Sequence, residues 1–171
     1  LVLKAIPLDI LAMQKIGFDA VGLGNHEFDY VPDVLADYLF AAGYPDAHSI
    51  TPIIASNIEA PKDHPLHQQG LYKEYHIIEL ESGIKIGLFG LLGKHAISAM
   101  ANAKGMTFED QHEIAKQAVD YLESQGVDII MALSHCGVDE DRELARSVEG
   151  IDVIIGGHTH TTLTEPVVEN N

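Results

Sequence analysis

The sequence predicts an α/β fold in which helices cover both faces of a mixed sheet. Segments with helical periodicity alternate along the chain with short apolar runs that are typical of strands. Two of these runs, at 74–81 and 84–92, are separated only by Ser82 and Gly83, which predicts an antiparallel hairpin beside parallel strands. No repeat or linker divides the 171 residues, so we expect one domain.

The first half of the chain shows clear start and stop signals for its helices. Pro7 and Pro32 suit the first turn of a helix, and Gly17 and Gly43 suit the position just after its end. Residues 58–72 have no clean period and are expected to form a loop. The elements predicted here are a helix at 6–16, a strand at 18–23, a helix from Pro32 and a strand at 53–57.

The second half contains longer elements. Ile114, Ala118 and Leu122 form one apolar stripe of the longest predicted helix, at 107–125. The runs 127–133 and 151–155 are continuously apolar, which predicts strands buried on both faces. A charged helix is expected between them, at 139–148.

Composition and charge exclude several classes of function. Hydrophobic residues make up 46% of the chain, enough for a buried core. The chain has 10 Lys and Arg residues and 26 Asp and Glu residues. The resulting formal charge of −16 disfavours binding to nucleic acid or to an anionic membrane surface. One cysteine excludes an internal disulfide framework. The chain has ten histidines, as many as its Lys and Arg residues together. A composition rich in histidine and acidic residues favours metal binding.

Three polar motifs each follow an apolar strand: GNHEFD at 24–29, SHCG at 134–137 and GGHTH at 156–160. In an open α/β sheet, ligands bind beyond the carboxyl ends of the strands, so we expect these loops to meet at one rim. They would bring together the following side chains: Asn25, His26, Glu27, Asp29, His135, Cys136, His158 and His160.

The chemistry of this group favours a metal site, because imidazole nitrogens and an amide oxygen are good ligands for transition metals. Asp29 lies three residues after His26 and can hydrogen-bond to its ring. Other interpretations stay open: Asp29 also suits a helix cap, Glu27 suits a carboxylate that braces the loop, and Cys136 suits a small buried apolar residue.

The remaining histidines are predicted to contribute less to such a site. Lys94 and His95 follow the strand at 84–92, so they can reach the same rim and contact a substrate phosphate. The others have no convergent neighbours or lie in the irregular loop, where surface exposure is expected: His48, His64, His67, His76 and His112.

With these motifs in this order, the chain resembles the calcineurin-like metallophosphoesterases. FDAVGLGNHEFD at 18–29, ASNI at 55–58, GIKIGLFGL at 83–91 and GIDVIIGGHTHT at 150–161 resemble the 5′-nucleotidase branch in particular. The resemblance runs through essentially the whole chain. It implies a metallophosphoesterase-type α/β sandwich with a mixed sheet.

The resemblance also implies a chemistry and a role for each site residue. It implies two divalent metal ions (Zn, Mn or Fe) and hydrolysis of nucleotides to nucleoside and phosphate by a metal-bound hydroxide. Asn25, His135 and His158 match ligands of one metal, and His160 matches a ligand of the other. His26 matches the acid, with Asp29 as its orienting carboxylate, and Asn25 and His26 match the substrate contacts.

The chain departs from the family pattern at both ends. The family begins with strands that end in Asp-x-His and Gly-Asp motifs, and neither motif occurs in the expected place here. We therefore expect residues 1–171 to be an incomplete catalytic domain, without its first strands and without a C-terminal nucleotide-binding domain. Such a piece is expected to be inactive alone, and exposed sheet edges would favour association with another chain.

Two alternatives to 5′-nucleotidase activity remain open at this stage. One keeps the site and changes the substrate to a 2′,3′-cyclic nucleotide or a nucleoside-diphosphate sugar. The other is a non-catalytic protein that binds a metal or an anion. The resemblance also implies a periplasmic or cell-surface location, on which the residues themselves are silent.

Overall fold

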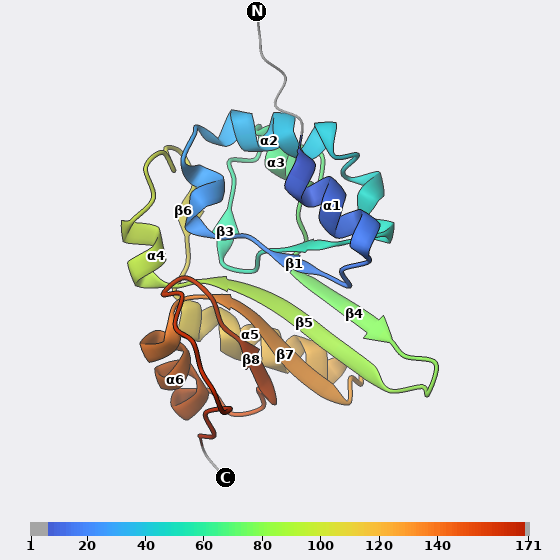
Figure 1. Ribbon diagram of the computed structural model, residues 1–171, viewed down its shortest axis with the longest axis vertical. Helices are drawn as coiled ribbons and strands as arrows, with labels where there is room; N and C mark the ends of the chain where they lie inside the picture. Colours follow the sequence, from blue (N-terminus) through green and yellow to red (C-terminus); the bar gives the residue numbers. More distant parts are fainter. Residues whose placement is uncertain (1–6, 170–171) are drawn as a thin grey trace, which may run out of the picture.

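The strands of the computed structural model, which describes residues 7–169, form three sheets (Figure 1). One sheet pairs β1 with β2, a second pairs β3 with β6, and the third has the order β4-β5-β7-β8. The strands are β1 (Val21–Gly22), β2 (Ile53–Ile54), β3 (Ile58–Glu59), β4 (Tyr75–Glu79), β5 (Lys85–Leu92), β6 (Thr107–Phe108), β7 (Ile129–His135) and β8 (Val153–Ile155).

The helices connect these strands in chain order. The α-helices are α1 (Leu8–Ile16), α2 (Pro32–Ala41), α3 (Pro65–Gln68), α4 (Lys94–Ser98), α5 (Gln111–Ser124) and α6 (Val138–Ser147). Two short 3₁₀ helices are η1 (Asn25–Phe28) and η2 (Asp46–Ser49).

The four-stranded sheet is mixed, as predicted. β4 pairs antiparallel with β5, whereas β5, β7 and β8 are parallel to one another. The hairpin turns at Gly83, whose φ of 87° lies in the left-handed region that glycine adopts without strain. The hairpin is therefore confirmed, with Tyr75 opposite Phe89 and Glu79 opposite Lys85.

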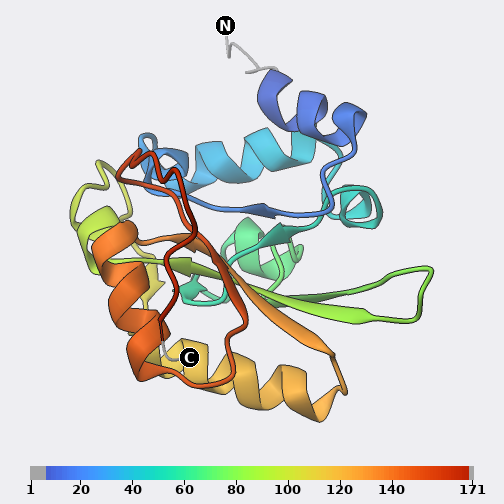
Figure 2. The same ribbon diagram turned by 60° about the horizontal axis from the view of Figure 1, so that its bottom comes forward.

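The layers form a sandwich. α5 and α6 cover one face of the four-stranded sheet, and the β1–β2 sheet with α1 and α2 lies on the other side (Figure 2). β1 approaches β7 closely, because a Cβ on Gly22 would lie 3.5 Å from the Cβ of Leu133. The predicted α/β sandwich is confirmed, although its strands divide among three sheets rather than forming one.

Two apolar cores hold the layers together. The first lies among α1, α2, α3 and the short strands, with Phe28, Leu39 and Leu71 fully buried at its centre. The second lies between the four-stranded sheet and the helices α5 and α6, where Phe89 and Leu122 are fully buried. A Cβ on Gly87 would lie 2.9 Å from the Leu122 side chain, so α5 packs directly on the backbone of β5.

Some element predictions were wrong in extent. Residues 58–72 contain β3 and α3 rather than only loop, and the helix expected at 107–125 begins at Gln111. Asp110 caps α5 by accepting hydrogen bonds from the backbone N–H groups of His112 and Glu113. Thr107 and Phe108 pair with β3 instead of joining the helix. The helix expected at 6–16 begins at Leu8, and residue 6 lies outside the described residues.

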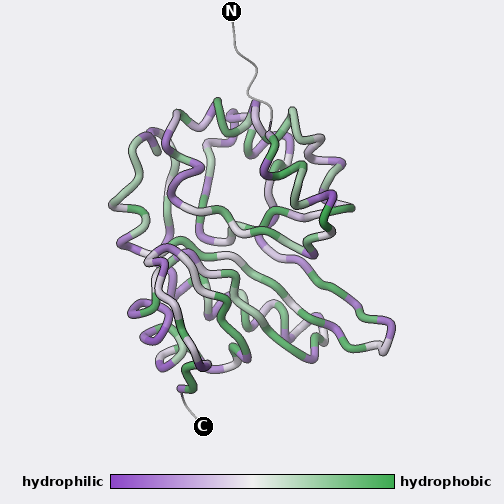
Figure 3. Tube along the Cα trace, viewed as in Figure 1, coloured by the Kyte–Doolittle hydropathy of each residue, from purple (hydrophilic) through white to green (hydrophobic). Residues whose placement is uncertain are grey.

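The prediction that two strands are buried on both faces was also wrong. Buried and half-buried residues alternate along β7, and Val153 and Ile155 of β8 are 41% and 52% exposed. β8 is the edge of its sheet, so one side of it has no neighbouring strand among residues 7–169. Apolar side chains are therefore exposed along this edge. Figure 3 colours β8 as hydrophobic.

Candidate metal centre

The loops after β1, β7 and β8 meet at one point, as predicted from their positions. The Asn25 side-chain oxygen, Oδ1, lies 2.8 Å from Nε2 of His135 and 3.2 Å from Nδ1 of His158. Asn25 is buried, and the two imidazole rings lie with their centroids 5.0 Å apart. Three donor atoms from η1, from the end of β7 and from the loop after β8 therefore converge.

The approach of Asn25 to His135 depends on the residue that precedes it. A Cβ on Gly24 would lie 2.8 Å from Cε1 of the His135 ring, closer than side chains approach. The Glu27 carboxylate accepts a hydrogen bond of 2.6 Å from the backbone N–H of Gly24 and holds this turn in place. Glu27 thus braces the loop, which was one of the interpretations left open.

His158 and His160 have an unusual backbone conformation. Their φ angles are 73° and 52°, the left-handed region that residues with a side chain rarely adopt. Between them, the N–H of Thr159 donates to the carbonyl of Gly157 in a tight turn. This turn directs the His158 ring inward, whereas His160 stays exposed.

Burial keeps the two inner imidazoles neutral. The pKa of His135 is lowered to about 4, mainly because the ring is partly buried and further because of the charges of His158, His26 and His160. Burial also lowers the pKa of His158, and the neighbouring His95 adds to that effect. At neutral pH both rings therefore keep a lone pair for a ligand.

His26 and Asp29 form a separate pair at the mouth of this group. Nδ1 of His26 lies 2.9 Å from Oδ2 of Asp29, and the His26 side chain is 74% exposed. Asn102 donates to the backbone carbonyl of Asp29 and so holds the pair from a different loop. Asp29 does not cap α2, because the cap position is Val31 and carries no side-chain cap.

Two residues of the predicted group lie apart from the donor atoms. His160 is exposed, and Cys136 is buried, where desolvation raises the pKa of its thiol to about 12. Across residues 7–169, no three His, Cys, Asp or Glu side chains are arranged to hold one metal ion. The third donor of the cluster is accordingly the Asn25 amide.

His95 joins the cluster from α4. Its Nδ1 lies 2.7 Å from Nε2 of His158, and the two ring centroids are 5.0 Å apart. The Glu140 carboxylate on α6 accepts hydrogen bonds from the backbone N–H groups of Lys94 and His95 and so fixes the start of α4. Sequence reasoning placed His95 at the rim but missed both partners, since neither lies near it in the chain.

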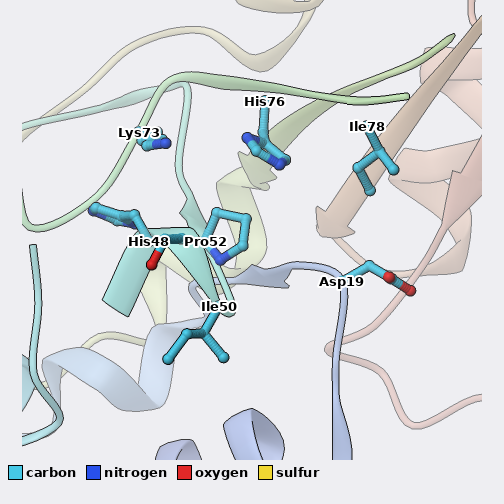
Figure 4. Close-up of a pocket in the computed structure, with 8 residues that line it drawn as sticks. Asp19, His48, Ile50, Pro52, Lys73, His76 and Ile78 are labelled. Atoms are coloured by element: carbon cyan, nitrogen blue, oxygen red, sulfur yellow. The ribbon is translucent and has the colours of Figure 1, made fainter. Parts of the chain in front are cut away.

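A second pair of histidines lines a pocket of about 460 Å³ on another part of the molecule (Figure 4). Nε2 of His48 donates to the carbonyl of Gly70, and Nδ1 accepts from the N–H of Ile53. Burial lowers the pKa of both His48 and His76, and the charge of Lys73 lowers it further. Sequence reasoning gave these two histidines no common neighbours, so this pocket was missed.

Comparison with known families assigns the chain to one of them. The family model described as calcineurin-like phosphoesterase matches residues 7–162, so the chain belongs to this family. Enzymes of this family use divalent metals. The donor set fits such an ion, because two neutral imidazoles and an amide oxygen face one another within 3.2 Å.

Three individual proteins show which members of the family the chain resembles. The chain is 33% identical to a 5′-nucleotidase of Diplobatis ommata over 152 residues, covering 88% of this chain and 25% of the relative. The crystal structure of a 5′-nucleotidase precursor from Thermus thermophilus matches with a TM-score of 0.80 and 34% identity, over 92% of this chain and 29% of that one. The NAD nucleotidase of Haemophilus influenzae matches with a TM-score of 0.77 and 29% identity, over 91% of this chain and 26% of that one. The chain thus spans between a quarter and a third of these relatives.

Across residues 7–169, every helix is too short or too polar to span a membrane.

Proposed function

We propose that the protein that carries this sequence is a metal-dependent hydrolase of nucleotide phosphoesters. One observation carries the proposal: Nε2 of His135 and Nδ1 of His158 converge on Oδ1 of Asn25 in a chain of the calcineurin-like phosphoesterase family. A divalent ion bound there supplies Lewis-acid polarisation of the phosphoryl oxygens. Asn25, His135 and His158 would hold that ion, and His160 would hold a second one.

His26 is the proposed acid. It is exposed at the mouth of the cluster, where a substrate can reach it, and it is not one of the converging donors. The Asp29 carboxylate accepts from Nδ1 of the ring, so the proton that His26 can give to a leaving group is the one on Nε2. Asn25 and His26 are the proposed substrate contacts.

Nucleoside monophosphates are the proposed substrates, and Zn, Mn or Fe the proposed metals. Support for the substrate comes from two similar proteins described as 5′-nucleotidases and one described as an NAD nucleotidase. A metal centre also removes the objection that a chain of charge −16 repels phosphate, because bound dications dominate the local field.

The test is hydrolysis by the protein that carries this sequence, loaded in turn with Zn²⁺, Mn²⁺ and Fe²⁺, with the products separated by chromatography. Three substrates are compared: AMP, which yields adenosine and phosphate; 2′,3′-cyclic AMP, which yields a nucleoside monophosphate; and UDP-glucose, which yields UMP and glucose 1-phosphate. AMP is expected to be hydrolysed fastest. The variant His158→Ala should lose both bound metal and turnover, whereas His67→Ala, an exposed histidine on α3, should keep both. Faster hydrolysis of the cyclic nucleotide or the nucleotide sugar would reassign the substrate. Metal binding without hydrolysis of any of the three would make this a binding protein.

We further propose a location outside the cytoplasm. One matching structure is described as a 5′-nucleotidase precursor, which supports processing of that relative. Fractionation of cells that express the native gene would place the protein in the periplasm, at the surface or, against the proposal, in the cytoplasm.

A further inference from the structure

One ring nitrogen of His95 faces one ring nitrogen of His158. The two ring nitrogens, Nδ1 of His95 and Nε2 of His158, lie 2.7 Å apart, and the ring planes are inclined by 56°. Two neutral imidazoles at this distance form one hydrogen bond, so one nitrogen carries the proton and the other accepts it. Geometry alone allows either direction.

The other nitrogen of His158 decides the direction. Nδ1 of His158 faces Oδ1 of Asn25 at 3.2 Å, on the side where the His135 ring also points its Nε2. A metal ligand must offer a lone pair, and a neutral imidazole carries one N–H. If Nδ1 binds the metal, Nε2 of His158 carries the proton and Nδ1 of His95 accepts it.

The acceptor is held in place by the fold. The backbone N–H groups of Lys94 and His95 donate to the Glu140 carboxylate at 2.9 and 3.0 Å, which fixes the first turn of α4 against α6. The hydroxyl of Ser98 donates to the carbonyl of His95 at 2.7 Å. The backbone of His95 is thereby anchored where its ring meets the loop that carries His158.

We propose that His95 is a positioning residue of the metal centre. Its Nδ1 accepts the proton of His158 Nε2, and this selects the tautomer of His158 that presents Nδ1 to the metal. The proposal rests on the proposed function, because it requires His158 to be a metal ligand. It assigns no metal contact to His95 itself.

Three variants separate this role from a structural one. His95→Leu keeps much of the bulk of the ring and removes the acceptor, whereas His95→Asn places its side-chain oxygen close to the position of Nδ1. His67→Leu, on α3, is the matched control at an exposed histidine. Zn²⁺ affinity is measured for each by competition with a chromophoric chelator. Removal of an outer partner of a metal-bound histidine typically weakens binding by about 10- to 100-fold.

The expected result is a loss of that size for His95→Leu, recovery of most of the affinity in His95→Asn, and no change for His67→Leu. Nitrogen-15 NMR of the histidine side chains supplies a second readout. In the Zn²⁺-loaded wild-type protein, Nε2 of His158 should be protonated and Nδ1 of His95 unprotonated. On addition of Zn²⁺, Nδ1 of His158 should shift, and neither nitrogen of His95 should show direct coordination.

Different failures have different meanings. Unchanged affinity in His95→Leu, with Nδ1 of His158 still bound to Zn²⁺, overturns the role of His95 and leaves the metal centre intact. A coordination shift at His95 makes it a ligand and likewise overturns the positioning role. No Zn²⁺-dependent shift at His135 or His158 in the wild-type protein overturns the metal centre and, with it, this proposal.

Discussion

The two groups of histidines in this protein use the same side chain in opposite ways. In the pocket group, both ring nitrogens of His48 bond to backbone atoms of Gly70 and Ile53. In the rim group, one ring nitrogen of His135 and one of His158 face the side-chain oxygen of Asn25 instead. Burial lowers the pKa of all three histidines, so a shifted pKa does not distinguish them.

What distinguishes the two groups is whether the ring nitrogens bond to backbone atoms or lie against another side chain. A histidine whose nitrogens are both taken by backbone groups contributes to folding, since those bonds are made only in the native chain. A histidine whose nitrogen meets the donor atoms of other side chains is arranged to hold a ligand between them. The following changes test that contrast, beginning with the largest expected effect.

The variant His26→Ala should lower turnover of AMP by about 100- to 10,000-fold, the usual contribution of a positioned acid. Metal content should stay close to that of the wild-type protein, because His26 bonds to Asp29 and is not one of the converging donors. Steady-state kinetics and metal analysis on the same sample check both points. Loss of metal together with activity would place His26 among the ligands.

The variant Gly24→Ala should weaken metal binding by about 10- to 100-fold, as expected when the surroundings of a ligand are disturbed. Gly24 has an ordinary extended backbone, with φ of −113°, so alanine fits the chain but pushes on the His135 ring. Calorimetric titration with Zn²⁺ measures the loss. Gly126→Ala is the control: it has open space but a φ of 69°, so it should lose stability and keep metal affinity.

The variant His48→Leu should lower the free energy of unfolding by about 1–3 kcal/mol, because it leaves the buried N–H of Ile53 without its partner. Metal affinity should not change. Denaturant unfolding measures the first and calorimetry the second, with His67→Leu expected to stay within about 0.5 kcal/mol of the wild-type protein. A metal defect in His48→Leu would show that the two groups of histidines are coupled.

The pH dependence of stability should show the smallest effect. Burial lowers the pKa of His48 below its ordinary value of 6.5, so the unfolded chain takes up the proton first. The neutral His48 ring contributes its full stability above pH 6.5, the ordinary pKa that the ring keeps in the unfolded chain. That contribution is lost as the pH falls from there through the lowered pKa of the folded state. Unfolding followed between about pH 7.5 and 5 should therefore show a shallower decline in His48→Leu than in the wild-type protein. Equal slopes would mean that His48 titrates alike in both states.

Local patterns predicted much of the fold and of the site. The hairpin β4–β5 could be predicted because its strands and its turn are adjacent in sequence. The three site loops could be predicted because each directly follows an apolar run. Positions beyond the carboxyl ends of strands form one rim in α/β folds, whatever their separation along the chain.

Contacts between distant segments could not be predicted in this way. His95 and His158 are 63 positions apart, and the carboxylate that anchors His95 is 45 positions away. Nothing in the residues around His48 indicates that Gly70 and Ile53 meet its ring. The exposure of β8 depends on which strands lie beside it, and an apolar run in the sequence does not specify those neighbouring strands.

The left-handed backbone at His158 and His160 has a consequence for how this protein can change. An L-residue in that region is disfavoured by about 1–2 kcal/mol, and glycine is not. Glycine at either position would therefore strengthen the fold and delete an imidazole from the rim. Selection for thermal stability alone would favour glycine at both positions, so stability and the proposed metal binding are in conflict there.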